Sequence, residues 1–194
     1  EIGKLGQLER HAQDTLIVTN SDGARAEPLS RESPKRWTLE RPNSGMNIGA
    51  WHAGWSALPA YGYYLFLQDE CRIERDDFLN AYITALNQPR VGLVGETINP
   101  RWAQPWAGLL NGALDTVEPE HEIDGRPTSR VQTYLHHLRT WGIDPGPTAT
   151  HLRSLVWFTR RGVIEEIGGF PSGRNRGECI AAEIAVPQSP PWAT

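Results

Sequence analysis

Gln68, Asp69 and Glu70 form a polar, acidic triplet directly after an apolar, aromatic-rich run over residues 61–67. Successive strand residues point to opposite faces, so Asp69 and Glu70 can bind two different groups, while Gln68 shares a side with Glu70. One carboxylate could reach a hydroxyl-bearing ligand and the other a hard cation. Oxygen ligands of this kind suit Mg²⁺ or Mn²⁺, which keep water molecules and bridge to phosphate oxygens. The alternative is a solvated acidic turn that caps the following helix.

A second polar segment follows the stretch over residues 15–19, which is short, apolar and rich in β-branched residues, as a buried parallel strand should be. This segment is Asn20, Ser21 and Asp22. Ligands of mostly parallel sheets bind beyond the carboxyl ends of the strands, where the loops converge. We therefore expect both strand ends to deliver polar side chains to one edge, where a polar ligand would bind.

Helical spacing and turn residues predict the elements that position these side chains. Helices are predicted from about residue 5 to 12, 46 to 58, 76 to 86, 130 to 141 and 160 to 167. Further strands are predicted at 63–67, 91–95 and 154–158, with a short edge strand at 36–40; residues 24–35 and 96–129 are predicted to be loops. Alternating strands and helices indicate an α/β fold, with a mostly parallel sheet flanked by helices on both faces.

Composition and charge limit the kinds of partner that the protein can bind. The 194 residues suffice for one sizeable domain, and 19 basic against 23 acidic side chains favour neither nucleic-acid binding nor a polybasic membrane surface. Cys71 and Cys179 lie far apart, which favours reduced thiols and a cytoplasmic setting. No stretch approaches the roughly 20 apolar residues of a membrane span. Because residue 1 is Glu and not Met, we expect the chain to be part of a longer protein.

Four segments in order resemble the nucleotide-sugar-binding core of GT-A fold glycosyltransferases close to family 2: TLIVTNSDG, RPNSGMNIGAWHAGWSAL, YYLFLQDECRI and SLVWFTRRGVIEEIGGFPSGRNRGECIAAEIA. The resemblance runs from about Thr15 to Ala185. It implies a single GT-A domain with a mostly parallel, Rossmann-like sheet that lacks the family's first strand. It also implies a nucleotide-sugar-binding half, about residues 1–95, and an acceptor and catalytic half, about residues 96–194.

The resemblance implies transfer of a sugar from a nucleotide-diphosphate donor to a carbohydrate or other hydroxyl-bearing acceptor, with inversion and with Mn²⁺ or Mg²⁺ as cofactor. By the family pattern Asp69 approaches the ribose and Glu70 the metal, with Asp69 as a second metal residue. The metal motif reads Gln-Asp-Glu where Asp-x-Asp is usual, so the register stays open. The residues expected to bind the nucleotide sugar are Asn20, Ser21, Asp22, Asn43, Gln68, Asp69, Arg160, Arg174 and Arg176.

Glu178 is the expected catalytic base, with Glu183 as a substitute, although the segment reads Gly-Glu-Cys where Glu-Asp is usual. A positioned carboxylate can take the proton of an attacking hydroxyl. Arginines match phosphate oxygens bidentately, but Arg160 and Arg161 could equally pair with neighbouring glutamates. Two other functions stay open: a nucleotidyltransferase on a related fold, and a non-catalytic nucleotide- or carbohydrate-binding relative.

Trp102, Trp106 and Trp141 flank the loop region from residue 96 to 129. Because apolar ring faces stack well on sugars, these side chains could form an acceptor platform. Core packing is the alternative, and for Trp141 it is at least as well supported.

Overall fold

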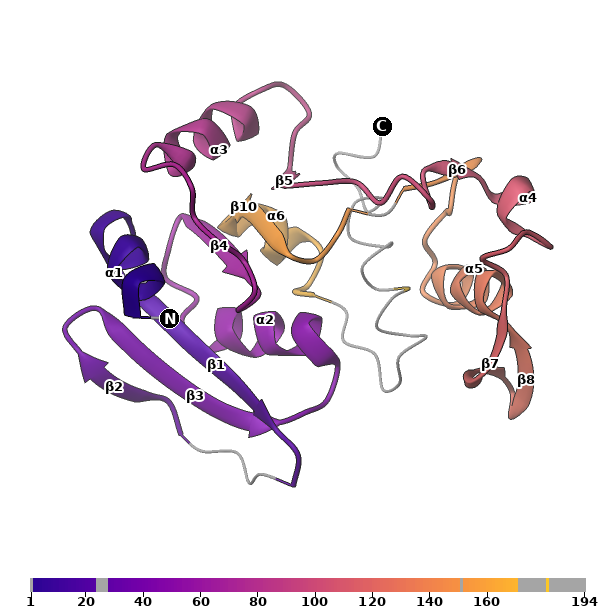
Figure 1. The fold of residues 1–194 in the computed structure, drawn as a ribbon, viewed down its shortest axis with the longest axis horizontal. Helices are drawn as coiled ribbons and strands as arrows, with labels where there is room; N and C mark the ends of the chain where they lie inside the picture. The colour runs from indigo at the N-terminus through magenta and orange to yellow at the C-terminus, as the bar shows by residue number, and fades with distance from the viewer. Residues whose placement is uncertain (1, 24–27, 151, 171–180, 182–194) are drawn as a thin grey trace.

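The computed structural model describes residues 2–23, 28–150, 152–170 and 181. In the first half, helices and strands follow in the order α1 (Ile2–His11), β1 (Thr15–Ser21), β2 (Ser30–Ser33), β3 (Arg36–Pro42), α2 (Met46–Ala57), β4 (Tyr63–Leu67), α3 (Phe78–Leu86) and β5 (Leu93–Gly95). The second half contains β6 (Gln104–Pro105), α4 (Trp106–Leu109), β7 (Val117–Ile123), β8 (Arg126–Ser129), α5 (Arg130–Thr140), β9 (Thr148–Ala149), β10 (Val156–Arg160) and α6 (Arg161–Glu166) (Figure 1).

The first sheet has the order β1-β3-β2, with β1 and β3 parallel and β2 antiparallel to β3. Lys35 ties α1 to this sheet, because its Nζ donates to the carbonyl oxygens of Glu9 (2.9 Å) and Ala12 (3.4 Å). The last carbonyls of a helix lack intrahelical partners, so a lysine at this end satisfies them and complements the helix dipole. Helix α2 packs on β1, where Gly54 allows a close approach to Leu16 and Val18.

The second sheet has the order β4-β10-β5 and is antiparallel throughout. Its central strand is buried on both faces, which explains the unbroken apolar run over residues 155–158. Trp157 packs against Trp51 of α2, with ring centroids 5.2 Å apart. Phe158 stacks on Tyr82 of α3 and on Tyr63, both at 5.7 Å. Helices α2 and α3 thus cover different faces of this sheet.

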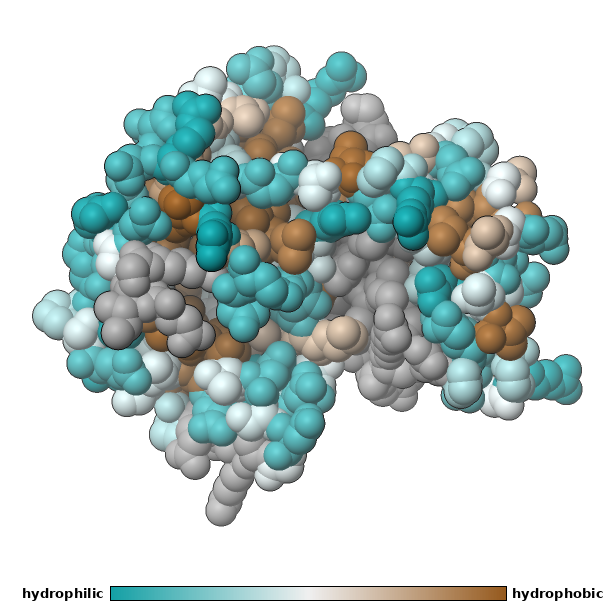
Figure 2. Space-filling view, in the orientation of Figure 1, coloured by the Kyte–Doolittle hydropathy of each residue, from teal (hydrophilic) through white to brown (hydrophobic). Residues whose placement is uncertain are grey.

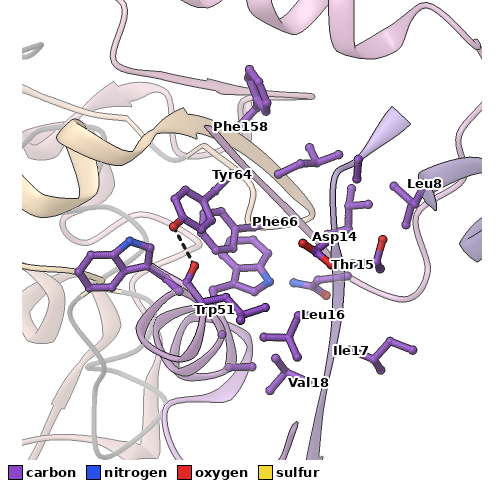
Figure 3. A pocket seen from close by; sticks show the side chains of 18 of the residues that line it. Leu8, Asp14, Thr15, Leu16, Ile17, Val18, Trp51, Tyr64, Phe66 and Phe158 are labelled. Atoms are coloured by element: carbon purple, nitrogen blue, oxygen red, sulfur yellow. Dashed lines mark hydrogen bonds between the residues drawn. The ribbon is translucent and has the colours of Figure 1, made fainter. Parts of the chain in front are cut away.

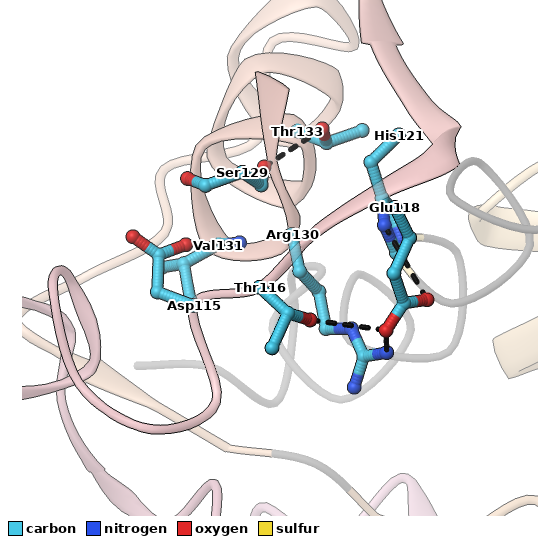
Figure 4. A network of polar contacts seen from close by, with 8 residues as sticks. All are labelled: Asp115, Thr116, Glu118, His121, Ser129, Arg130, Val131 and Thr133. Atoms are coloured by element: carbon cyan, nitrogen blue, oxygen red, sulfur yellow. Dashed lines mark hydrogen bonds and ion pairs between the residues drawn. The ribbon is translucent and has the colours of Figure 1, made fainter. Parts of the chain in front are cut away.

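Residues 98–150 build a smaller unit around the hairpin of β7 and β8 and the helix α5. Asp124 and Gly125 both have positive φ at the tip of this hairpin, as tight two-residue turns require. The Asp115 carboxylate accepts a hydrogen bond from the Val131 backbone N–H at 2.9 Å at the start of α5. Glu118 pairs with Arg130, and Thr116 Oγ1 donates to Glu118 at 3.0 Å (Figure 4). Side chains from the segment before β7 and from β7 therefore hold the N-terminus of α5.

The expected mostly parallel, Rossmann-like sheet is not observed, and this fold prediction is wrong. The sheets have two or three strands each, and β1 with β3 is the parallel pair among the described strands. Hydrophobic runs correctly indicated buried strands, but they carry no information on pairing direction. That direction depends on which distant segments meet, and β10 inserts antiparallel between β4 and β5.

Most individual elements agree with their predicted positions to within a few residues. α1, β1, α2, β4, α3, β5, α5, β10 and α6 are confirmed. The predicted edge strand at 36–40 is instead the central strand β3, because β2 pairs with its other side. β2 lies in the first predicted loop, and β6, α4, β7 and β8 lie in the second. None of the helices in the described part of the chain has the length and hydrophobicity that a membrane span requires.

Two of the tryptophans proposed as a sugar platform lie in the hydrophobic core instead. Trp102 and Trp106 are each 6% exposed and pack with Tyr134, Leu135 and other side chains of α4 and α5. Trp141 is 36% exposed and stacks on His137 at 5.7 Å. An acceptor surface formed by Trp102 and Trp106 is therefore excluded.

Asp14 joins the beginnings of β1 and β4, which belong to different sheets. The Tyr61 hydroxyl donates to Asp14 Oδ2 at 2.5 Å, and the Trp37 indole N–H donates to Oδ1 at 3.1 Å. The hydrogen bond from Tyr61 is the main cause that lowers the pKa of Asp14. Burial, followed by the hydrogen bond to Asp14, raises the pKa of Tyr61 to about 12.

Tyr61→Phe should lower the free energy of unfolding by roughly 1–2 kcal/mol near pH 7, because a hydrogen bond to a carboxylate is lost. The lowered pKa of Asp14 stabilises the fold above the ordinary value of 3.8, and this contribution is lost as the pH falls through the folded pKa. The raised pKa of Tyr61 stabilises the fold below pH 10, and this contribution is lost toward about pH 12. Urea unfolding across this range should therefore show the deficit shrinking at both ends.

Tyr63→Phe is the matched control, because Tyr63 is 45% exposed and its ring stacks on Phe158 within the second sheet. It should leave stability nearly unchanged. A deficit of Tyr61→Phe that stays constant from pH 3 to pH 11 would contradict the proposed bond.

Candidate functional site

A cavity of about 1360 Å³ lies between β1 and β4. Side chains from α1, β1, α2, β4 and α3 line it. Figure 3 shows Leu16 and Val18 of β1 on the side of Trp51, and Ile17 on the opposite side of the strand, toward Leu8. In the space-filling view, apolar surface shows between hydrophilic side chains in the region of α1 and β4 (Figure 2). The walls are mainly apolar.

The carboxyl ends of β1 and β4 form a polar mouth on this cavity. Asn20 from β1, Asn43 from the segment after β3, and Gln68 and Asp69 from the end of β4 all line it. The structure thus brings together four residues that the sequence singled out as ligand-binding. They come from three segments that are separated by more than 20 residues in the chain.

Arg41 fixes the amide of Asn20 at the mouth. Its Nη1 donates to Asn20 Oδ1 at 2.8 Å, while Nη2 donates to the backbone oxygen of Ser44 at 2.7 Å and to its hydroxyl at 2.9 Å. Asn20 Nδ2 in turn donates to the Met46 carbonyl at 3.1 Å. Sequence reasoning did not identify Arg41 as part of the site. Arg41 directly precedes Pro42 and Asn43 at the end of a predicted strand, and this position could have identified it as a site residue.

The backbone carbonyl of Ser154 fixes a second part of the mouth. Gln68 Nε2 donates to it at 2.6 Å and Asn47 Nδ2 at 3.2 Å. The Gln68 backbone N–H also donates to Leu155 O at 2.9 Å, which extends the pairing between β4 and β10 by one residue. Gln68 therefore holds the end of β4 in place.

Asp69 and Glu70, which follow the end of β4, are both exposed, and of the two only Asp69 is among the residues that line the cavity. Both line a smaller hollow of about 490 Å³, together with Gln7, Cys71, Arg72, Ile73 and Glu74. Within the described ranges, no group of three or more His, Cys, Asp or Glu side chains could hold a metal ion. Two adjacent carboxylates nevertheless fit Mg²⁺ or Mn²⁺, because such ions often take one or two carboxylates and complete their shell with water and substrate phosphate.

His52 is a half-buried histidine of α2 near Arg41. Burial, and after it the charge of Arg41, lowers the pKa of His52. Its ring packs against Trp55, with centroids 6.0 Å apart, and a Cβ at Gly169 would lie 2.6 Å from His52 Cε1. Gly169 also has a φ of +91°, so glycine is required there on both counts.

Ser21 and Asp22 contact the segments beside the mouth. The Ser21 hydroxyl donates to Glu40 Oε1 at 2.8 Å, and Ser21 does not line the cavity. Asp22 is exposed, and its carboxylate accepts a long hydrogen bond of 3.4 Å from Asn43 Nδ2. Among the contacts that are described, the hydrogen bond from Asn43 is therefore what connects Asp22 to the mouth.

Arg160 lies at the opposite end of the second sheet. Because β10 is antiparallel to β4, Arg160 pairs with Tyr63, at the start of β4, whereas Gln68 follows its end. Arg160 Nη2 donates to Leu86 O at 2.6 Å and to Asn87 Oδ1 at 3.0 Å. Arg161 pairs with Glu165 at 3.4 Å. Glu178, Glu183, Arg174 and Arg176 lie outside the described residues.

Gly49→Ala should lower the free energy of unfolding by about 1–3 kcal/mol and loosen the Asn43–Met46 segment. A Cβ at Gly49 would lie 2.2 Å from the Ser44 backbone oxygen and 3.3 Å from Arg41 Nη1, so backbone must move. Chemical denaturation measures the change. Gly162→Ala is the matched control, since a Cβ there has no neighbour within 4 Å and alanine favours a helix. Equal stability of the two variants would contradict the close contact.

The chain was compared with models of protein families, with curated proteins and with solved structures, and none of the three comparisons found a match.

Proposed function

We propose that the protein is a glycosyltransferase that moves a sugar from a nucleotide-diphosphate donor to an acceptor hydroxyl, assisted by Mn²⁺ or Mg²⁺ and with inversion. The observation that carries this proposal is the polar mouth, where Asn20, Asn43, Gln68 and Asp69 line one cavity. The sequence resemblance assigns the same residues to the nucleotide sugar. Carboxylates and amides at converging strand ends are groups that recognise ribose hydroxyls and nucleobase edges.

Different residues at the mouth contact different parts of the donor. Asn20 and Asn43 offer amide groups to the nucleoside, and Asp69 accepts hydrogen bonds from ribose hydroxyls. The hydrogen bonds from Arg41 and to Met46 hold the Asn20 amide, so little side-chain entropy is lost when a ligand binds. Gln68 acts indirectly, because its amide holds the end of β4 against Ser154 and thereby positions Asp69.

Glu70, with Asp69, is the proposed ligand of the divalent cation. When bound, Mn²⁺ or Mg²⁺ neutralises the charge that develops on the departing diphosphate. The exposure of both carboxylates supports this role, since the donor phosphates must complete the coordination shell. The hollow beside them offers room for phosphate oxygens.

Glu178 is the proposed base on the strength of the sequence resemblance. Its carboxylate takes the proton of the acceptor hydroxyl, whose oxygen lone pair forms the new bond to the anomeric carbon. The bond from that carbon to the diphosphate breaks on the opposite side, and its electron pair leaves with the nucleoside diphosphate. Attack from the side opposite the leaving group inverts the configuration.

Thermal-shift measurements with UDP, GDP, ADP, CDP and dTDP, each with and without MnCl₂, test the donor site. One nucleotide should raise the melting temperature only in the presence of Mn²⁺. At one hundred times the Kd the stabilisation is about 2.7 kcal/mol, or roughly 5–10 °C for a chain of this size. Asp69→Asn and Glu70→Gln should remove most of the shift.

Asp124→Asn is the matched control, because Asp124 lies in the remote hairpin turn with positive φ, which asparagine tolerates. This variant should keep the full shift. A nucleotide shift that needs no metal, or that survives both Asp69→Asn and Glu70→Gln, would overturn the proposed cation site.

Glu178→Gln separates an enzyme from a non-catalytic relative. With the nucleotide sugar identified by the shift, release of nucleoside diphosphate should fall by about 10²–10⁴-fold, because the hydroxyl proton has no acceptor. The nucleotide-dependent melting shift should stay within error of that of the unmodified protein. Unchanged turnover would remove Glu178 from the mechanism.

A further inference from the structure

Within the part of the chain that the structure describes, two strand edges face the cavity without a strand partner. Over the described ranges β1 pairs with β3 alone and β4 pairs with β10 alone, so each is the edge strand of its sheet. Residues of both strands line the same cavity. An edge strand presents a row of N–H and C=O groups that are ready to pair with another strand.

The two edges run in the same direction along the cavity. The hydrogen bond between Tyr61 and Asp14 brings their beginnings together. Their ends, at Asn20 and Gln68, both lie at the polar mouth. The arrows of β1 and β4 in Figure 1 point the same way. The cavity is therefore a slot with two roughly parallel sides made of backbone.

Apolar side chains cover the slot on both faces. Trp51 of α2 lies on the face of Leu16 and Val18, and Leu8 of α1 lies on the face of Ile17 (Figure 3); Trp55 of α2 also lines the slot. Strands that are apolar on both faces are normally buried between two layers. Leu16, Ile17 and Val18 are only half-buried, as are Leu65 and Leu67 of β4. The apolar surface that these strands leave uncovered faces the slot.

We propose that the slot binds one extended peptide segment with apolar, β-branched side chains, which lies between β1 and β4 and pairs with both. The proposed occupant is a strand of this kind that a partner polypeptide presents. This proposal is independent of the proposed function, because it uses the backbone edges and apolar walls and none of the carboxylates at the mouth. Recognition is by strand addition, in which main-chain hydrogen bonds supply affinity and alternate side chains enter pockets on each face.

The size and polarity of the slot favour a peptide over a small apolar ligand. Its 1360 Å³ exceeds the roughly 300–1,000 Å³ of ordinary small-molecule pockets. β1 has seven residues and β4 has five, so a strand of about five residues, roughly 17 Å long, could pair with both. A hydrocarbon would leave the facing N–H and C=O groups without partners, whereas a peptide supplies both.

A second copy of this chain is a poor occupant. The other described edge of the first sheet is β2, with the polar sequence Ser-Arg-Glu-Ser and three exposed residues. The other edge of the second sheet is β5, which has only three residues. Neither element offers an apolar strand of the length that the slot requires.

The test is titration of the 194-residue chain with the acetylated peptide Val-Thr-Val-Ile-Val followed by two lysines for solubility. Calorimetry should give a 1:1 complex, and hydrogen exchange of the amides of β1 and β4 should slow at least tenfold. The control peptide carries proline at the central valine, which removes a ladder donor and fixes φ. It should bind at least tenfold more weakly. Equal affinity of the two peptides, or no binding of the first, would overturn the proposal.

Two further measurements, on variants of the chain, test whether the peptide binds in the slot. Val18→Thr keeps the side-chain shape but places a hydroxyl on the apolar wall, and it should weaken the valine peptide several-fold. Glu70→Gln, at a residue that is not among those lining the slot, should leave peptide binding unchanged while it removes most of the metal-dependent nucleotide shift, so failure of the two proposals is distinguishable. Dimerisation of the chain that the peptide does not reverse would show a second copy in the slot and overturn the assignment.

Discussion

Backbone hydrogen bonding along β1 and β4 is the constraint on which the rest of the structure depends. Both strands are apolar on two faces and each pairs on one side only within the described residues. The bond from Tyr61 to Asp14 holds their beginnings together, but no ladder joins them along their length in the part of the chain that the structure describes. The space that results is a cavity with apolar walls, backbone sides and a polar mouth.

The mouth combines amides that are held by hydrogen bonds with carboxylates that are exposed to solvent. Arg41 and the Ser154 carbonyl fix the amides of Asn20 and Gln68 through bonds of 2.8 and 2.6 Å. Asp69 and Glu70, by contrast, are exposed at the end of β4. This division suits a site in which rigid amides define the position of an organic ligand and solvated carboxylates attract a cation. It also places the proposed donor-binding groups at one end of the slot, and the apolar length between the strands is the proposed peptide site.

Local sequence signals predicted most elements because periodicity and turn residues act over a few residues. The run from Tyr63 to Leu67 and the polar triplet after it correctly marked the end of a strand. The same reasoning missed β7 and β8, whose alternation of charged and apolar residues is weak and whose turn, Asp124–Gly125, was read as part of a long loop. Trp102 and Trp106 look like a binding surface in the sequence, yet α5 buries them, and only tertiary packing supplies that cover.

The sequence by itself determined which side chains stand at strand ends, and four of these line one cavity: Asn20, Asn43, Gln68 and Asp69. Tertiary structure alone decided how the strands pair. Pairing depends on contacts between segments about 90 residues apart, such as β4 with β10, and hydrophobic patterns do not encode direction. The antiparallel entry of β10 puts Arg160 at the far end of its sheet from Gln68, because reversing a strand exchanges its two ends. Strand pairing, and not the hydrophobic pattern of the sequence, also makes β1 and β4 edge strands that face each other.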